Sequence, residues 1–168
     1  SGQSISHEDI VAGALTFSPL ANENGVGYDS FVYTVNDGLA DSLNQATLTI
    51  DVTAVDDLPT AADTTVTLTE DTQFVFAVAD FGFVDVDAMD QLQSITITSL
   101  ASVGKLELNG AGVTANQAIS QSDISAGALT FTPFEDGNGV GYDSFNFTVN
   151  DGVADSFVPS TLTIGVTA

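Results

Sequence analysis

Aspartate residues gather in two short stretches of the chain, and their side chains have the clearest chemical potential. Asp56 and Asp57 are adjacent, and Asp85, Asp87 and Asp90 follow within one short segment. Carboxylates crowded in this way repel one another unless a cation neutralises them. Ca²⁺ takes about six to eight oxygen ligands, mostly carboxylates and carbonyls, in flexible geometry. The two stretches therefore predict calcium ligands, with Asp57, Asp85 and Asp87 foremost.

The local spacing of these acids does not match the 12-residue calcium loop of an EF-hand. Asp85 and Asp87 fit its first and third ligand positions, but Met89 stands at the fifth. Asp90 replaces the required glycine, and Thr96 replaces the final glutamate. The glycine-rich nonapeptide of calcium-binding β-rolls is also missing. Ligands must therefore come from segments that the fold brings together.

Composition excludes several other functions. The chain has no cysteine, so a disulfide framework and thiolate metal sites are excluded. His7 is the only histidine, and no Gly-x-Ser-x-Gly elbow accompanies it, so a hydrolytic triad has no base. A glycosidase pair among 23 acids is an unspecific guess. We therefore predict that the protein is not an enzyme.

The net charge of −22, with Lys105 as the only Lys or Arg, repels nucleic acid and anionic membranes. No apolar run approaches the length of about 18 residues that a membrane helix needs, so no membrane insertion is expected. Cations are the partners that such a surface attracts.

An internal repeat organises the chain. Residues 3–54 align with residues 117–168 without a gap at an offset of 114, with 35 of 52 positions identical. This period exceeds that of solenoid repeats, so each unit is expected to be a domain. The prediction is a C-terminal half-repeat at 1–54, an acidic linker at 55–60 and a complete repeat at 61–168.

Alternation with a period of two dominates both copies. Short segments rich in Thr, Val, Ile and Phe, separated by turn residues, indicate an all-β sandwich. The triplets 36–38 and 150–152, each Asn-Asp-Gly, predict hairpin turns, and a single helical turn fits only 9–12 and 123–126. The predicted core comprises Phe74, Phe76, Ile95, Ile97, Leu106, Phe145, Phe147, Val149, Leu162 and Ile164.

An up-and-down order of strands brings distant acids to one end of each unit. Strand 28–35 runs toward its turn and strand 46–54 returns, so the linker leaves from the end with Asn24 and Asp29. In the second unit, the turn with Asp151 and the loop after strand 72–78 face the linker. The predicted ligands at this junction are Asp57, Asp85, Asp87, Asp56, Asp29, Asn24, Asp90 and Asp151.

A second group of oxygen ligands, Glu70, Asn138 and Asp143, is predicted to form half of the next junction. The alternative interpretation of all these acids is that they are solvated loop residues of a protein adapted to high salt.

Several motifs resemble a known family. The linker Val55-Asp-Asp-Leu-Pro59 resembles the acidic linker of cadherins, Asp85-Val-Asp87 resembles their Asp-x-Asp element, and Glu70 resembles their early glutamate. Segments 69–72, 80–87 and 143–152 are similar to bacterial cadherin-like repeats of large secreted repeats-in-toxin adhesins. Segment 119–131 resembles the proteoglycan-type repeat of that superfamily. The family's mid-domain Asp-Arg-Glu motif is missing, because the chain has no Arg.

The resemblance implies tandem immunoglobulin/cadherin-like β-sandwich repeats that calcium stiffens into a spacer or adhesion module at the bacterial cell surface. The expected partners are calcium ions and neighbouring repeats or other copies of the chain. A surface glycan or another cell-surface target bound elsewhere in the parent protein stays open. The alternatives are a subunit of an extracellular filament or surface layer, as in a biofilm, and a carbohydrate-binding module. The chain lacks the Trp platforms typical of the last.

Overall fold

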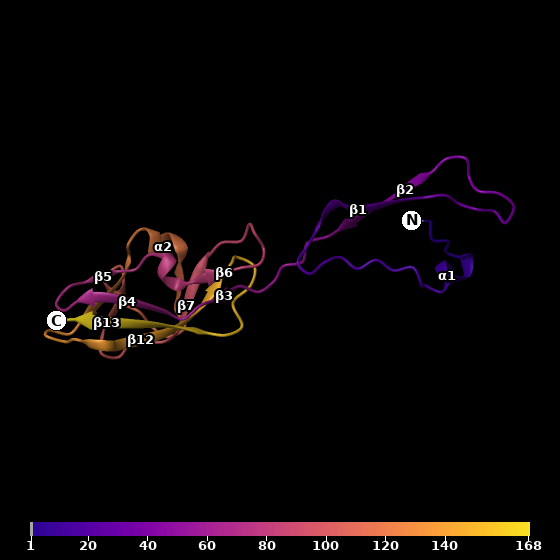
Figure 1. The fold of residues 1–168 in the computed structure, drawn as a ribbon. Coiled ribbons are helices and arrows are strands. Elements are labelled where there is room, and N and C mark those ends of the chain that lie inside the picture. Colours follow the sequence, from indigo (N-terminus) through magenta and orange to yellow (C-terminus); the bar gives the residue numbers. More distant parts are fainter. Residues whose placement is uncertain (1) are drawn as a thin grey trace. The chain divides into compact units, whose positions relative to one another are not determined.

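The computed structural model describes residues 2–168, and the chain folds into two compact units. The first unit ends at Val55 and the second is Asp56–Ala168. Figure 1 shows the second unit as a stack of strands and the first as a long hairpin with one short helix. Among residues 2–168, no helix has both the length and the apolar character that crossing a bilayer requires.

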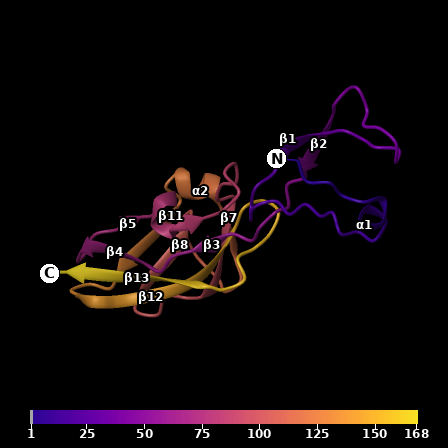
Figure 2. The same cartoon turned by 45° about the vertical axis from the view of Figure 1, so that its right-hand side comes forward.

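The second unit is an all-β sandwich, as predicted. One sheet has five strands in the order β10 (Ala118–Ser120), β7 (Ser94–Ser99), β12 (Gly139–Asn150), β13 (Ser160–Thr167) and β4 (Thr64–Thr69). The other sheet has the order β5 (Phe74–Val75), β11 (Leu129–Pro133), β8 (Gly104–Leu108) and β9 (Ala111–Gly112). The pair of β4 with β13 is parallel, and the other pairs are antiparallel. β12 and β13 lie side by side in Figure 2.

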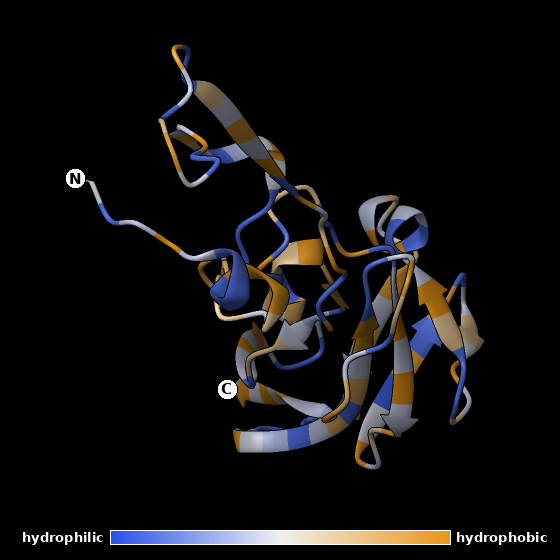
Figure 3. Ribbon diagram, turned by 90° about the vertical axis from the view of Figure 1, so that its right-hand side faces the viewer, coloured by the Kyte–Doolittle hydropathy of each residue, from blue (hydrophilic) through white to orange (hydrophobic). Residues whose placement is uncertain are grey.

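The core lies between these sheets, and the predicted register is confirmed. Nine of the ten predicted core residues are buried, and Phe74 is partly buried at the rim. Figure 3 shows the alternation of apolar and polar residues along the strands that produces this core. The core also contains buried residues outside the predicted set: Val66, Leu68, Phe81, Leu92, Val113, Ile119, Ile124, Leu129, Phe131 and Val166.

The predicted strand at 72–78 is wrong beyond Val75. The chain leaves β5 and forms a 3₁₀ helix, η1 (Val78–Phe81), whose first turn is held by the Asp80 carboxylate accepting from the Ala77 N–H at 2.8 Å. This turn places Phe81 in the core, edge-on to Phe147 with ring centroids 5.2 Å apart. Burial of this aromatic ring therefore overrides the alternation that suggested a longer strand.

Two shorter elements complete the second unit. β3 (Thr60–Ala61) pairs antiparallel with β6 (Phe83–Val84), and α2 (Gln121–Ser125) lies between β10 and β11 in the chain. Residues 56–60, predicted as a linker, belong to this unit, where Pro59 is buried and Asp57 is half-buried. The acidic segment is thus held against the sandwich by the β3–β6 pair.

The first unit contains α1 (His7–Val11) and one antiparallel hairpin of β1 (Gly25–Tyr33) and β2 (Ala46–Val52). The helical turns predicted at 9–12 and 123–126 are both present, and each starts two residues earlier than expected. The predicted tight turn at 36–38 is part of a longer loop closed by a bridge between Asn36 and Asp41. Gly38 adopts the positive φ of 95° that the prediction required.

Candidate metal centre

Strand pairing brings the acidic segment at the start of the second unit to the acidic loop. In the β3–β6 pair, Thr60 lies opposite Val84, so residues before Thr60 run alongside residues after Val84. The Asp57 N–H donates a hydrogen bond of 2.9 Å to Oδ2 of Asp87. Two segments that are 30 residues apart in sequence are thereby joined.

The acidic loop is compact because its carboxylates and carbonyls bind its own backbone. Oδ1 of Asp85 accepts from the Asp87 N–H at 2.9 Å, and the Asp87 carbonyl accepts from the Asp90 N–H at 3.0 Å. These bonds bend the loop so that its three acids stay close to one another. Such local bonds between Asp side chains and the backbone are typical of tight loops.

Carboxylate oxygens of Asp56, Asp87 and Asp90 lie within 4.8 Å of one another. Asp56 is exposed, and the other two are half-buried. Separations of this size suit oxygens that share one cation.

Asp151 enters the same group from the loop after β12. Its Oδ1 accepts from the Val153 N–H at 2.7 Å and the Ala154 N–H at 2.8 Å, which fixes the side chain. Asp151 is only 6% exposed, and its Oδ2 is buried without a hydrogen-bond partner among residues 2–168. Oδ2 of Asp85 is buried and unpartnered in the same way. Buried carboxylate oxygens without partners are costly, and a cation is the partner that relieves them.

Desolvation and the mutual repulsion of these acids both raise the pKa of Asp56 and of Asp90. Desolvation, followed by the charges of Asp151, Asp90, Asp87 and Asp85, raises the pKa of Asp56. The pKa of Asp90 is raised by desolvation and then by the charges of Asp85, Asp87 and Asp151. Lys105, the only Lys or Arg, lies in β8 opposite Thr132, in the other sheet. Negative charge is therefore concentrated in one group of acids, which we call the acidic cluster: Asp56, Asp57, Asp85, Asp87, Asp90 and Asp151.

Glu70 and Asn138 lie at the opposite end of the five-stranded sheet. The Glu70 N–H donates to the Thr167 carbonyl at the end of β13, whereas Asp151 follows the end of β12 that lies near the start of β13. The Asn138 side-chain amide donates to Oε2 of Glu70 at 2.8 Å. The two residues are therefore together and separate from the acidic cluster, and their role in a second junction stays a prediction.

Asp143 has a structural role in the second unit. Its carboxylate accepts from the N–H groups of Ser102, Val103 and Gly104 at 2.8 to 3.0 Å, and from the Ser144 N–H at 2.8 Å. A nearly buried carboxylate with four donors is an anchor for the loop before β8. No sequence pattern indicates this role, because three of the four donors are backbone groups of residues 39 to 41 positions away.

Asn24 and Asp29 belong to the first unit. The Asp29 carboxylate accepts from the Ser30 N–H at 2.7 Å, and both residues are exposed. Their predicted contribution to a calcium junction stays a prediction.

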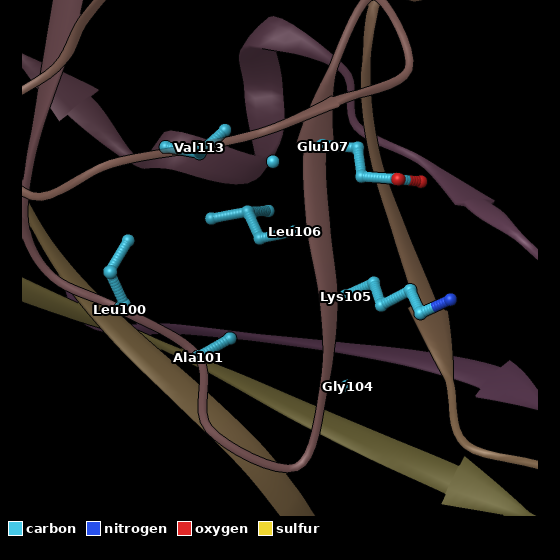
Figure 4. A pocket seen from close by; sticks show the side chains of 8 residues that line it. Leu100, Ala101, Gly104, Lys105, Leu106, Glu107 and Val113 are labelled. Carbon is cyan, nitrogen blue, oxygen red and sulfur yellow. The ribbon is translucent and has the colours of Figure 1, made fainter.

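A shallow hollow of about 270 Å³ beside β8 offers no second candidate site. Leu100, Leu106 and Val113 line it, while Lys105 and Glu107 project from the other side of β8 (Figure 4). None of its lining residues is a histidine or carries a hydroxyl group. His7, the only histidine, is exposed in α1 of the first unit.

Comparison with known proteins places the sandwich in a family. No curated protein matches the chain. The family model described as "Bacterial Ig domain" matches residues 56–165, which is most of the chain and nearly all of the second unit. The two-sheet architecture agrees with this match. The chain therefore belongs to the bacterial Ig domain family.

Proposed function

We propose that the second unit binds calcium through the acidic cluster, and that the protein is a non-catalytic module of a bacterial surface adhesin of the cadherin-like type. The module acts outside the cell as a spacer, with calcium stiffening the chain where one unit follows another. Asn24 and Asp29 of the first unit are proposed to add oxygens to the ion's shell.

The observation that carries the calcium proposal is the pair of buried, unpartnered oxygens on Asp85 and Asp151. Solvated surface acids do not lose both water and hydrogen-bond partners, because that combination is costly. Both oxygens belong to the acidic cluster, in which carboxylate oxygens of Asp56, Asp87 and Asp90 lie within 4.8 Å of one another. The Asp87 carboxylate also accepts a hydrogen bond from the Asp57 N–H. A bound cation satisfies the oxygens and cancels the repulsion at once.

The donor set favours calcium over other metals. The six members of the acidic cluster are all carboxylates from three segments of the second unit, which suits a hard cation that accepts irregular shells of about six to eight oxygens. Mg²⁺ is usually bound by one or two carboxylates and keeps several waters. Zn²⁺ prefers nitrogen and sulfur ligands, and the chain has no cysteine and one histidine.

Calorimetric titration of the full chain with Ca²⁺ at low salt tests the proposal. The expected Kd is on the order of 10⁻⁴ M, as in extracellular modules, or tighter if several acids share two ions. Asp151→Asn keeps the oxygen that binds the Val153 and Ala154 N–H groups but removes the charge. It is expected to weaken binding at least tenfold, and Asp85→Asn is expected to do the same.

Asp37→Asn is the matched control, because Asp37 occupies the same turn in the first unit with the same two backbone bonds, from Leu39 and Ala40. Its titration curve is expected to match that of the unmodified chain. A chain that shows no calcium heat, or Asp85→Asn and Asp151→Asn variants that bind normally, would exclude this site.

The spacer role has its own test. Small-angle scattering of the full chain is expected to show a narrower distribution of interatomic distances with Ca²⁺ than with chelator. Asp29→Asn is expected to reduce this difference if the first unit contributes to the shell. Identical scattering curves with and without Ca²⁺ would contradict stiffening while leaving calcium binding by the second unit intact.

A further inference from the structure

The loop after β12 is closed at its base by two of its own side chains. The Asn150 side-chain oxygen accepts from the Gly152 N–H at 2.8 Å, and its amide nitrogen donates to Oδ1 of Asp155 at 2.9 Å. The backbones of Asn150 and Asp155 also form an antiparallel bridge. We call this pair of residues, Asn150 and Asp155, the clasp.

The clasp encloses Asp151, whose two carboxylate oxygens have different surroundings. Oδ1 accepts the N–H groups of Val153 and Ala154 within the loop, whereas Oδ2 is buried with no hydrogen-bond partner among residues 2–168. After desolvation, the charge of Asp151 contributes most to the raised pKa of Asp56, so the loop lies close to the acidic cluster. One oxygen therefore fixes the side chain, and the other is left for a cation.

The first unit shows that this loop takes the same form without an acidic cluster. Asn36 accepts from the Gly38 N–H at 2.7 Å and donates to Oδ1 of Asp41 at 2.8 Å. Asp37 again accepts two backbone N–H bonds, and no neighbouring carboxylate among residues 2–168 contributes to its lowered pKa. The shape of the loop is therefore a product of its own hydrogen bonds.

We propose that the clasp positions Asp151 for cation binding, and that Asp155 acts as a positioning residue and not as a ligand. Asp155 is exposed and its carboxylate already accepts the Asn150 amide. Because local bonds order Asp151 before an ion binds, the entropic cost of binding is lower. This inference rests on the proposed calcium binding by the acidic cluster, to which it adds two residues that do not touch the ion.

Asn150→Asp separates positioning from charge. It replaces the hydrogen bond of the clasp with two facing carboxylates, whose repulsion is expected to open the loop. The variant also adds a negative charge beside the acidic cluster, and charge alone would tighten calcium binding. Positioning predicts the opposite. In calorimetric titration of the full chain, the Kd for Ca²⁺ is expected to rise at least tenfold.

Exchange of donor and acceptor across the clasp is expected to rescue binding. The double variant of Asn150→Asp with Asp155→Asn keeps the net charge and restores a hydrogen bond between the two side chains. Its Kd is expected to return close to that of the unmodified chain. Asn36→Asp is the matched control, because it makes the same change opposite Asp41 in the first unit, and it is expected to leave the Kd unchanged.

Amide hydrogen exchange of Val153 and Ala154 in calcium-free protein tests the clasp without the ion. Exchange at both residues is expected to be faster in Asn150→Asp and to return to normal in the double variant. Unchanged or tighter calcium binding by Asn150→Asp would overturn the positioning role, as would a double variant that stays weak. Faster exchange in Asn150→Asp, combined with no calcium heat from the unmodified chain, would keep the clasp as a structural feature but exclude the proposed function and the positioning role together.

Discussion

Residues 15–19 and β11 differ only by Ser18 in place of Thr132, yet only β11 is a strand. β11 pairs with β5 and β8, and Leu129 and Phe131 are fully buried between the sheets. Among residues 2–55 of the first unit, no strand pairs with residues 15–19 as β5 and β8 pair with β11. Nearly the same sequence therefore forms a strand only where neighbouring strands are present, because the backbone hydrogen bonds of a strand need a partner.

The capped helical turns teach the opposite lesson. α1 and α2 both form, and in each the N-cap Ser hydroxyl accepts an N–H bond of 3.1 Å from the Asp three residues later. Ile124 is buried in the core, whereas Ile10 is exposed. These turns are determined locally, because cap and helix lie within six residues of one another.

Asp37 and Asp151 occupy the same position of an equivalent turn in the two units. Both carboxylates accept two backbone N–H bonds from the following residues. These bonds, from Ala40 and Leu39, lower the pKa of Asp37. Asp151 instead lies among other acids and contributes to the raised pKa values of Asp56 and Asp90. The same motif is thus a plain turn in one unit and part of a charged cluster in the other.

Truncation at equivalent apolar positions of the two hairpins is expected to give the largest difference between the units. Phe145→Ala should lower the free energy of unfolding of the second unit by about 3–5 kcal/mol, because it leaves a cavity in a closed core. Phe31→Ala should cost less than about 1 kcal/mol, since the ring is already partly in water. Urea unfolding with hydrogen exchange in β12 and β1 measures both. A cost under about 1 kcal/mol for Phe145→Ala would remove that residue from the core.

Calcium is expected to separate the units next. Ca²⁺ at about 100 times its Kd should stabilise the second unit by about 2.7 kcal/mol, because the ion binds only the folded cluster. Chelator should remove this gain, which thermal melts of the full chain detect. Asp85→Asn, whose Kd is expected to rise at least tenfold, should keep at most about half of this gain, about 1.4 kcal/mol, while Asp37→Asn should keep the full shift. Equal calcium-induced shifts in melting temperature for the Asp85→Asn and Asp37→Asn variants would contradict calcium binding by the acidic cluster.

Removal of the cap hydroxyls is expected to have a smaller effect. Ser120→Ala should lower the free energy of unfolding of the second unit by about 1 kcal/mol, because α2 loses its N-cap bond next to the core. Ser6→Ala removes the same bond from α1, which has no buried residue, and should leave the second unit unchanged. Urea titration of both variants decides. A loss in the second unit on Ser6→Ala would show that the two units are coupled.

The smallest expected effect is in titration. In calcium-free protein, Asp56 and Asp90 should titrate above the ordinary Asp pKa of 3.8, and Asp37 below it. The folded second unit then binds protons more tightly than its unfolded chain. The contribution of these two carboxyl groups to its stability is therefore greatest at low pH and falls as pH rises through the raised values. Asp37 has the opposite sign, because its contribution is lost as pH falls through its lowered pKa. Carboxyl ¹³C shifts measure each midpoint, and coincident midpoints would contradict the cluster.

The sequence by itself determined the repeat, the hairpin registers, the capped turns and nine of the ten predicted core residues. Periodicity and local hydrogen bonding suffice for these features, as the matching registers of Phe31 and Phe145 show. Every acid of the cluster was also predicted from the sequence, because acidic residues next to turn residues can be recognised without a structure.

Only the tertiary structure decided which of those acids meet. The β3–β6 pair brings Asp57 to Asp87, and the end of β12 adds Asp151, while Asp143 is taken up by three N–H groups from another loop. The same holds for Phe81, which a 3₁₀ turn carries into the core against the strand pattern. In each case the partner is distant in sequence, so its identity depends on pairing and burial between segments, which no local pattern encodes.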